Sequence, residues 1–292
     1  MPHNPISICS LGATLGEGPV WVEADAALWF VDIKKKRIHR FEPQANRLRS
    51  WPAPAQPGWI LPASDGTLLT GLQTGLHRFD PEMGSFTPLV APEADLPGNR
   101  LNDATVGADG ALWFGSMDDG EEQASGHVYR FAGGAVARST LDPVVITNGP
   151  AFSPDGGTLY HVDTLGRRIW AVEHRADGTL DTPRLFVEIE DGAGYPDGPT
   201  VDAEGHVWIG LFGGWGVRRY APDGRLVSTT RFPVANVTKI AFGGEGLRTA
   251  YATTARKGLS EAALKDQPLA GDLFAFQPGV AGCPTRPISL IG

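Results

Sequence analysis

A short β-prone motif recurs six times along the 292 residues of the chain. Each copy consists mostly of apolar and aromatic residues, and successive copies begin 40, 44, 47, 48 and 43 residues apart. The copies are Leu28-Trp29-Phe30, Leu68-Leu69-Thr70, Leu112-Trp113-Phe114, Leu159-Tyr160-His161, Val207-Trp208-Ile209 and Ala250-Tyr251-Ala252. Repeats of roughly 40 to 50 residues are typical of propeller blades. The spacing therefore predicts six equivalent structural units.

Turn sequences divide each unit into about four short strands. The chain has 38 glycines and 24 prolines, and turns such as 108–110 precede most of the motifs. Only residues 259–265 could form a turn or two of helix. We therefore predict an all-β, six-bladed β-propeller with four-stranded blades, a single domain over residues 1–292. Residues 6–8 and 287–290 are expected to pair and close the ring.

The composition limits the partners of this protein. The net charge is -8 and the pI about 5.4, with no basic stripe, so nucleic acid is disfavoured. No run of eighteen apolar residues and no secretion signal is present, which predicts a cytoplasmic protein without a membrane association. A monomer is the favoured state. Cys9 and Cys283 are the only cysteines, and both are expected to stay reduced, although closure of the ring could make them neighbours.

The repeat register aligns one position in every unit. It lies eight residues before a turn glycine, or before Asp25 in the first unit. The six aligned residues are Glu17, Gly58, Asn102, Asn148, Asp197 and Thr238. Equivalent positions just before the innermost strands of a propeller converge at a channel mouth. We therefore expect these six residues to form one ring.

Four members of this ring carry a carboxylate or an amide: Glu17, Asn102, Asn148 and Asp197. Two carboxylates facing one point repel each other unless a cation lies between them. Oxygen ligands suit Ca²⁺, Mg²⁺ or Mn²⁺, and Zn²⁺ or Fe²⁺ also occupy such sites. Three ring residues precede Gly-Pro, so an alternative is that they only satisfy backbone groups in turns.

Four motifs in chain order resemble those of one known family. They are Leu15-Gly16-Glu17-Gly18-Pro19-Val20-Trp21, Arg100-Leu101-Asn102-Asp103, Thr147-Asn148-Gly149-Pro150 with Ser153-Pro154-Asp155-Gly156, and Tyr195-Pro196-Asp197-Gly198. This pattern resembles the senescence-marker-protein (regucalcin), gluconolactonase and luciferin-regenerating-enzyme family. The resemblance covers essentially the whole chain. It implies a six-bladed propeller with one catalytic divalent metal ion, of which calcium, zinc, manganese, magnesium and iron are all candidates.

The resemblance also implies roles for individual residues. Glu17, Asn148 and Asp197 match the family's metal ligands, and Asp197 is the candidate catalytic base. Arg100 and Asn102 match its substrate contacts, although a surface salt bridge is an alternative for Arg100. The family's acidic substrate contact has three candidate counterparts in one loop: Asp119, Glu121 and Glu122.

The implied reaction is the hydrolysis of a sugar lactone, an aldono-1,4- or 1,5-lactone such as xylonolactone or gluconolactone, to the free aldonic acid. A metal ion can polarise the lactone carbonyl and acidify a bound water. Two alternatives are a phosphotriesterase-like hydrolase acting through the same metal and a non-catalytic calcium-binding propeller. A Gly-x-Ser-x-Gly motif is absent from the sequence, which disfavours a serine nucleophile.

Several further side chains are candidates for roles in the site or in the blades. The aromatic residues Tyr195, Phe212 and Trp215 either line the site or pack within blades. Structural roles are expected for the histidines His39, His77 and His161. The basic pair at 256–257 is either a loop contact or a solvated turn.

Overall fold

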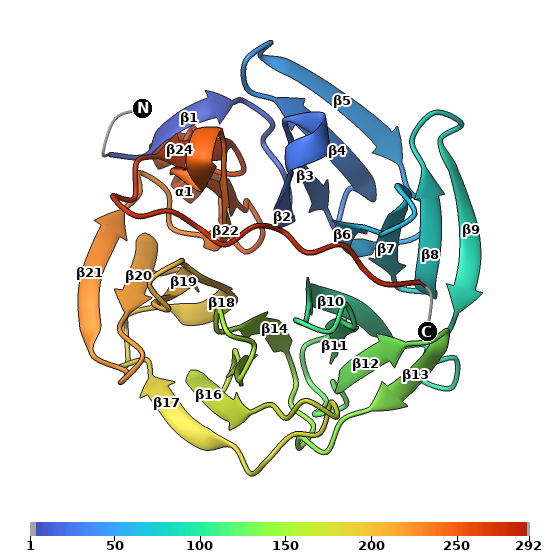
Figure 1. Cartoon of the computed structure of the whole chain (residues 1–292). Helices are drawn as coiled ribbons and strands as arrows, with labels where there is room; N and C mark the ends of the chain where they lie inside the picture. Colours follow the sequence, from blue (N-terminus) through green and yellow to red (C-terminus); the bar gives the residue numbers. More distant parts are fainter. Residues whose placement is uncertain (1–3, 291–292) are drawn as a thin grey trace.

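The computed structural model describes residues 4–290, and within them the strands form six antiparallel sheets of four strands each, arranged in a ring around a common centre (Figure 1). The first three blades contain β2 (Gly16–Val22), β3 (Ala27–Asp32), β4 (Arg37–Glu42) and β5 (Arg47–Pro52); β6 (Pro57–Pro62), β7 (Leu68–Leu72), β8 (Gly75–Asp80) and β9 (Ser85–Val90); and β10 (Asn99–Val106), β11 (Leu112–Asp118), β12 (Val128–Ala132) and β13 (Ala135–Arg138). The predicted six-bladed propeller is confirmed.

The fourth and fifth blades repeat this order, and the sixth combines both ends of the chain. They contain β14 (Thr147–Phe152), β15 (Thr158–Asp163), β16 (Arg168–Glu173) and β17 (Arg184–Glu188); β18 (Tyr195–Val201), β19 (Val207–Phe212), β20 (Gly216–Tyr220) and β21 (Leu226–Arg231); and β22 (Val237–Gly243), β23 (Thr249–Thr254), β24 (Leu273–Phe276) and β1 (Ile6–Cys9). All six repeated motifs lie in the second strand of a blade.

The second strands supply much of the core between neighbouring blades. Leu28, Leu112 and Val207 are fully buried, and Trp113 and Trp208 are almost so. Burying an apolar side chain of this size contributes roughly 1.5–3 kcal/mol. The apolar repeat therefore marks the strands that hold adjacent blades together.

The ring closes through a pairing that differs from the predicted one. Strand β1 pairs antiparallel with β24, not with residues 287–290. The C-terminal segment instead crosses the channel opening (Figure 1), where Ile288 bridges Ala63 and the amide of Ser289 donates to the carbonyl of Gly110. Strand β24 is fully buried, and it is the better partner because its apolar side chains fill the sixth blade.

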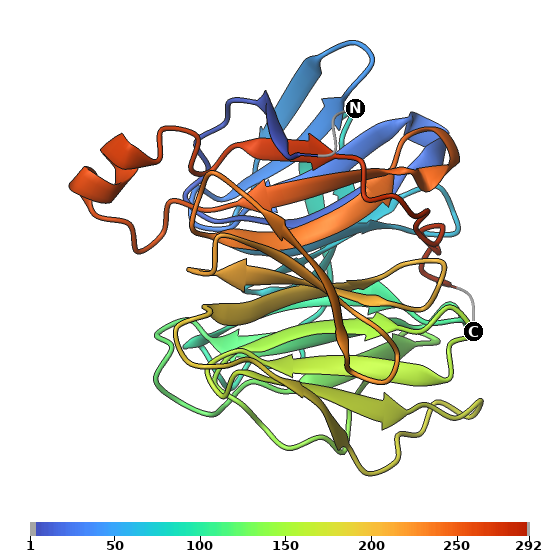
Figure 2. The same cartoon turned by 90° about the vertical axis from the view of Figure 1, so that its left-hand side faces the viewer.

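The two faces of the disc differ. The short helix α1 (Glu261–Asp266) projects from one face (Figure 2). It overlaps the helical turns expected at 259–265, and the side chain of Ser260 caps its N-terminus. The C-terminal segment lies on the opposite face. We call these the α1 face and the C-terminal face. Among residues 4–290 no helix is long and apolar enough to cross a bilayer, and Cys9 and Cys283 are free thiols.

The buried histidines make the stability dependent on pH. Burial lowers the pKa of His39 and of His161 to about 4, against about 6.5 in an unfolded chain. Because the unfolded state binds the protons more readily, the free energy of unfolding is expected to fall as the pH drops from about 6.5 to about 4, by about 3 kcal/mol per histidine. Denaturant unfolding across this range measures the slope. His161→Phe should remove the part of this pH dependence that comes from His161. If the free energy of unfolding of that variant changed with pH as steeply as that of the wild type, this assignment would be wrong.

Candidate functional site

The six aligned positions all lie within the innermost strands of the blades, β2, β6, β10, β14, β18 and β22, rather than just before them. In every blade the pairing with the second strand shifts register at or next to this position, for example between Glu17 and Val20 and between Asn148 and Ala151. Such bulges bend a strand and redirect its side chains. The repeated Gly-Pro dipeptides thus fall inside the bulges, and the preceding polar side chains reach the channel.

A cavity of about 250 Å³ opens at this ring. Its lining includes all four polar ring residues and extends to two other predicted site residues, Arg100 and Glu121. The remaining wall is largely apolar and comprises Leu15, Met117, Ile146, Thr164, Leu165, Tyr195, Phe212 and Lys257. Residues from five of the six blades therefore converge on one space, although they are far apart in the sequence.

Two carboxylates lie side by side in this cavity. Glu17 and Asp197 are 6% and 7% exposed, and they are close enough for each to shift the pKa of the other. Burial, and then the neighbouring carboxylate of Asp103, raises the pKa of Glu17 to about 7. Burial, and then the charge of Glu17, raises the pKa of Asp197 well above its ordinary value. Such a pair requires either a shared proton or a cation.

The amide of Asn148 completes an oxygen-rich corner beside these carboxylates. Asn148 Nδ2 donates to Thr164 Oγ1 (2.9 Å), and Asn148 Oδ1 accepts from Asn102 Nδ2 (3.0 Å). The Oδ1 atom keeps a second lone pair for a ligand. Among residues 4–290 no group of three or more His, Cys, Asp or Glu side chains is placed to hold a metal ion. A metal here would therefore depend on an amide oxygen with two carboxylates, a donor set that fits a hard divalent ion.

Arg100 is held by polar partners on two sides. It is only 3% exposed, which argues against the surface salt bridge considered above. Its Nη1 donates to Asn102 Oδ1 (2.6 Å) and its Nε to Asp119 Oδ1 (2.9 Å). Its Nη2 has no hydrogen-bond partner within the described part of the chain. That nitrogen is available to a ligand in the cavity.

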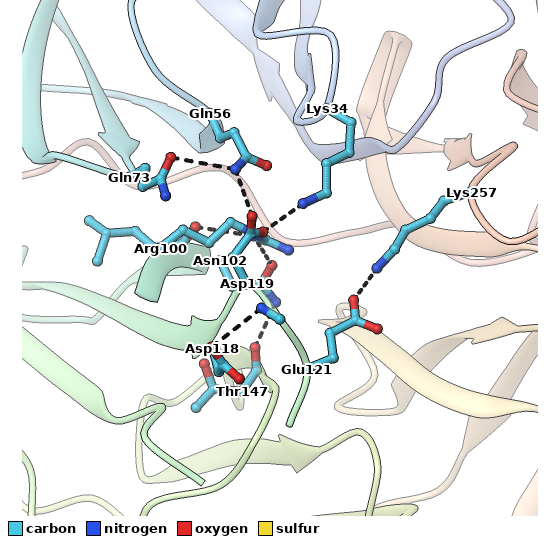
Figure 3. Close-up of polar contacts among 12 residues, drawn as sticks. Lys34, Gln56, Gln73, Arg100, Asn102, Asp118, Asp119, Glu121, Thr147 and Lys257 are labelled. Carbon is cyan, nitrogen blue, oxygen red and sulfur yellow. Dashed lines mark hydrogen bonds and ion pairs between the residues drawn. The ribbon is translucent and has the colours of Figure 1, made fainter. Parts of the chain in front are cut away.

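The three acidic candidates of the 119–122 loop occupy different places, and Figure 3 shows two of them, Asp119 and Glu121. Asp119 is not part of the cavity lining and binds Lys34 Nζ (2.6 Å) and Gln56 Nε2 (2.8 Å) as well as Arg100. Although burial opposes the shift, these hydrogen bonds and the charge of Arg100 lower the pKa of Asp119 to about 2. Glu121 lines the cavity, and Glu122 is exposed.

The other candidate residues also fall into those that line the cavity and those that do not. Tyr195 and Phe212 line the cavity, whereas Trp215 is 40% exposed and is not part of its lining. The histidines at 39, 77 and 161 are buried within blades and outside this lining. Of the basic pair, Lys257 lines the cavity and contacts Glu121, while Arg256 Nε donates to the carbonyl of Ala270.

Sequence reasoning missed a buried ion pair below the ring. Lys239 Nζ donates to Asp103 Oδ1 (2.6 Å), and Gly149 donates its amide to Asp103 Oδ2 (2.9 Å). Both charged side chains line a second cavity of about 160 Å³ toward the C-terminal face. The sequence did contain a signal for this pair, because Asp103 and Lys239 each directly follow one of the six aligned ring positions. The charge of Asp103 raises the pKa of both Glu17 and Asp197, so the pair lies next to the site, on the side of this second cavity.

Comparison with known proteins places the chain in a family. Residues 15–256 match the family model described as the SMP-30/Gluconolactonase/LRE-like region. The chain belongs to this family. Among its relatives, L-arabinolactonase of Azospirillum brasilense is 39% identical to this chain over 276 residues, which cover 93% of this chain and 91% of that protein. The 6-deoxy-6-sulfogluconolactonase of Pseudomonas putida is 32% identical over 272 residues, with coverages of 93% and 94%.

Solved structures in the same family share the whole architecture. The calcium-binding protein regucalcin from Agrobacterium tumefaciens superposes with a TM-score of 0.93 at 30% identity, covering 99% of this chain and 98% of that one. A luciferin-regenerating enzyme gives a TM-score of 0.91 at 26% identity, with coverages of 98% and 99%. The family resemblance noted in the sequence is confirmed.

Proposed function

We propose that this protein hydrolyses a sugar lactone to the free aldonic acid with the help of one divalent metal ion. The observation that carries the proposal is the buried pair Glu17 and Asp197 beside the amide oxygen of Asn148, in a cavity that also presents a free nitrogen of Arg100. The relatives named as lactonases support the reaction class. The substrates in view are pentonolactones and hexonolactones.

The metal would be held by Glu17, Asn148 and Asp197, and calcium, magnesium, manganese, zinc and iron are the candidate ions. When bound, it would supply Lewis acidity toward the lactone carbonyl and the attacking water. The buried pair Lys239–Asp103 brings one positive and one negative charge. The two ring carboxylates therefore keep an unbalanced negative charge that favours a cation.

Asp197 is assigned the proton transfer. Its carboxylate orients the attacking water and takes one of its protons as the oxygen adds to the carbonyl carbon. The ring C–O bond then breaks, and the proton passes to the departing ring oxygen, which becomes the new hydroxyl. The water supplies the second carboxylate oxygen of the acid product, so atoms and charge balance.

Arg100, Asn102 and Glu121 are assigned to substrate binding. Arg100 offers its free Nη2 to a hydroxyl or to the lactone oxygen, and a guanidinium fixed by two partners donates with defined geometry. Asn102 keeps Arg100 and Asn148 in place through its two hydrogen bonds. The rings of Tyr195 and Phe212 can contact the apolar C–H faces of a sugar.

Acid release from a panel of pentono- and hexonolactones, followed by pH-stat, tests this function. The same samples are tested against a phosphotriester whose leaving group absorbs light. Opening of at least one lactone well above its spontaneous rate is the expected result. Hydrolysis of the phosphotriester alone would favour phosphotriesterase-like chemistry, and metal binding without any turnover would favour a calcium-binding propeller.

Asp119 is expected to act through Arg100 rather than on the substrate. Asp119→Ala should leave the Arg100 side chain free to shift, and misplacement of a binding group by about 1 Å can cost on the order of 100-fold in rate. We expect kcat/KM for the lactone to fall by roughly 10- to 100-fold, mainly through KM. Asp65→Asn, which alters an exposed carboxylate paired with Arg78, is the control. An unchanged KM would contradict this role.

A further inference from the structure

A third cavity adjoins the proposed active site on the α1 face. This adjoining cavity measures about 400 Å³ and is lined by Arg167, Tyr195, Phe212, Asn236, Lys257 and the glycine-rich turns around them. Three of these residues, Tyr195, Phe212 and Lys257, also line the 250 Å³ cavity that contains the carboxylates. The two spaces thus share a wall, and Lys257 stands at their boundary.

The inner cavity is smaller than most ligand sites. At about 250 Å³ it lies below the usual range of roughly 300–1,000 Å³ for ligand sites. With the adjoining cavity included, the available space falls inside that range. The adjoining cavity, which lies beyond Lys257, thus offers space for an exocyclic chain on a lactone ring placed at the carboxylates.

The Lys257 side chain is held at this boundary by an ion pair with Glu121. Its backbone is fixed on two sides, because its amide donates to the Thr14 carbonyl (2.9 Å) and its carbonyl accepts from Asn236 Nδ2 (2.9 Å). Its ammonium group reaches across the cavity mouth to Glu121, 136 positions away in the chain (Figure 3). Both side chains are about a third exposed, at 31% and 34%. An ion pair at this exposure is weak enough for a ligand to displace.

We infer that Lys257 and the adjoining cavity bind the exocyclic polyol chain of the substrate and so determine which lactones are accepted. This inference rests on the proposed lactonase function. Lys257 donates to hydroxyls of the chain and Glu121 accepts from them, so a hydroxylated chain replaces the ion pair that closes the mouth of the free protein. The matching substrate class is aldono-1,4-lactones that carry one or two exocyclic hydroxylated carbons.

Turn glycines keep the adjoining cavity open. A Cβ atom added at Gly213 would meet no heavy atom within 4 Å, so a larger residue there would occupy the cavity. Gly213 has a φ of +75°, a left-handed conformation that asparagine tolerates better than other residues. Gly213→Asn therefore reduces the space without removing a charge.

The test compares three lactones that share ring hydroxyls but differ in their exocyclic chains: a tetrono-, a pentono- and a hexono-1,4-lactone. Wild-type protein, Lys257→Met and Gly213→Asn are assayed for kcat and KM with each. Lys265→Met, an exposed lysine on α1, is the matched control. We expect Lys257→Met to lower kcat/KM for the hexonolactone about tenfold or more through KM, as loss of a charged hydrogen bond does. The kcat/KM for the tetronolactone should change less than twofold. Gly213→Asn should likewise lower kcat/KM most for the hexonolactone and least for the tetronolactone.

Equal losses on all three lactones in both variants, or no loss with the hexonolactone, would overturn the inference while leaving the lactonase function in place. If the wild-type protein opens none of the three lactones, nor any other of the panel, the proposed function fails and this inference fails with it. The wild-type rates therefore separate the two failures.

Discussion

Asp197→Asn is expected to lower kcat for lactone hydrolysis by roughly 100- to 10,000-fold, the usual contribution of a positioned general base. The substitution keeps the shape of the side chain but removes its ability to accept a proton. It also removes one of two adjacent buried carboxylates, Glu17 being the other. The metal-free variant should therefore unfold at the same temperature as the wild type or at a higher one.

Steady-state kinetics and thermal unfolding of the same preparations measure both effects. Asp223→Asn, at an exposed turn of the same blade, controls for the loss of an aspartate. If activity and thermal stability fell together in Asp197→Asn, the residue would have a mainly structural role and the assignment of the proton transfer would be wrong.

Glu17→Gln is expected to abolish tight binding of the divalent ion. The side chain is buried beside Asp197 and offers the second carboxylate of the proposed ligand set. At an ion concentration of 100 times Kd, binding stabilises a folded protein by about 3 kcal/mol. We expect wild-type protein to show this stabilisation and Glu17→Gln to lose it, together with its lactonase activity.

Calorimetric titration and thermal unfolding, each with and without the ion, give readouts that do not depend on turnover. Glu23→Gln changes an exposed glutamate just after the same strand and should behave as the wild type does. Unchanged ion affinity in Glu17→Gln would show that the ion, if any, binds elsewhere.

The fold was predictable because a propeller repeats one physical unit. Every blade needs an apolar second strand to pack against its neighbours, so motifs such as Leu112-Trp113-Phe114 recur at blade spacing. The same register located the ring residues, since equivalent positions of a closed ring must converge. Only their placement inside the strands, at the bulges, required the structure.

The acidic loop shows why some site residues could not be assigned from the sequence. Asp119 and Glu121 are two positions apart, yet one holds Arg100 behind the cavity and the other lines it. Their directions depend on the local backbone. Asp118 accepts hydrogen bonds from the amides of Glu122 and Gln123, and Glu121 has a φ of +62°. No periodicity specifies such a loop.

Long-range contacts outside the repeat could not be predicted from the sequence either. Lys257 lies in a loop between β23 and α1 and reaches Glu121 only because the ring brings the third and sixth blades toward the same mouth. The C-terminal segment crosses the opposite face instead of joining the sixth blade, because β24 already pairs with β1. Neither feature follows from the blade pattern.

The central claim is that the carboxylates at 17 and 197 hold one catalytic divalent ion. The most direct measurement strips the protein with a chelator, adds back one candidate ion in steps, and records bound ion and lactone opening in the same samples. We expect a rate near the spontaneous one at zero ion and a linear rise that ends at one ion per chain. Lactone opening that is undiminished in the fully stripped protein would contradict it.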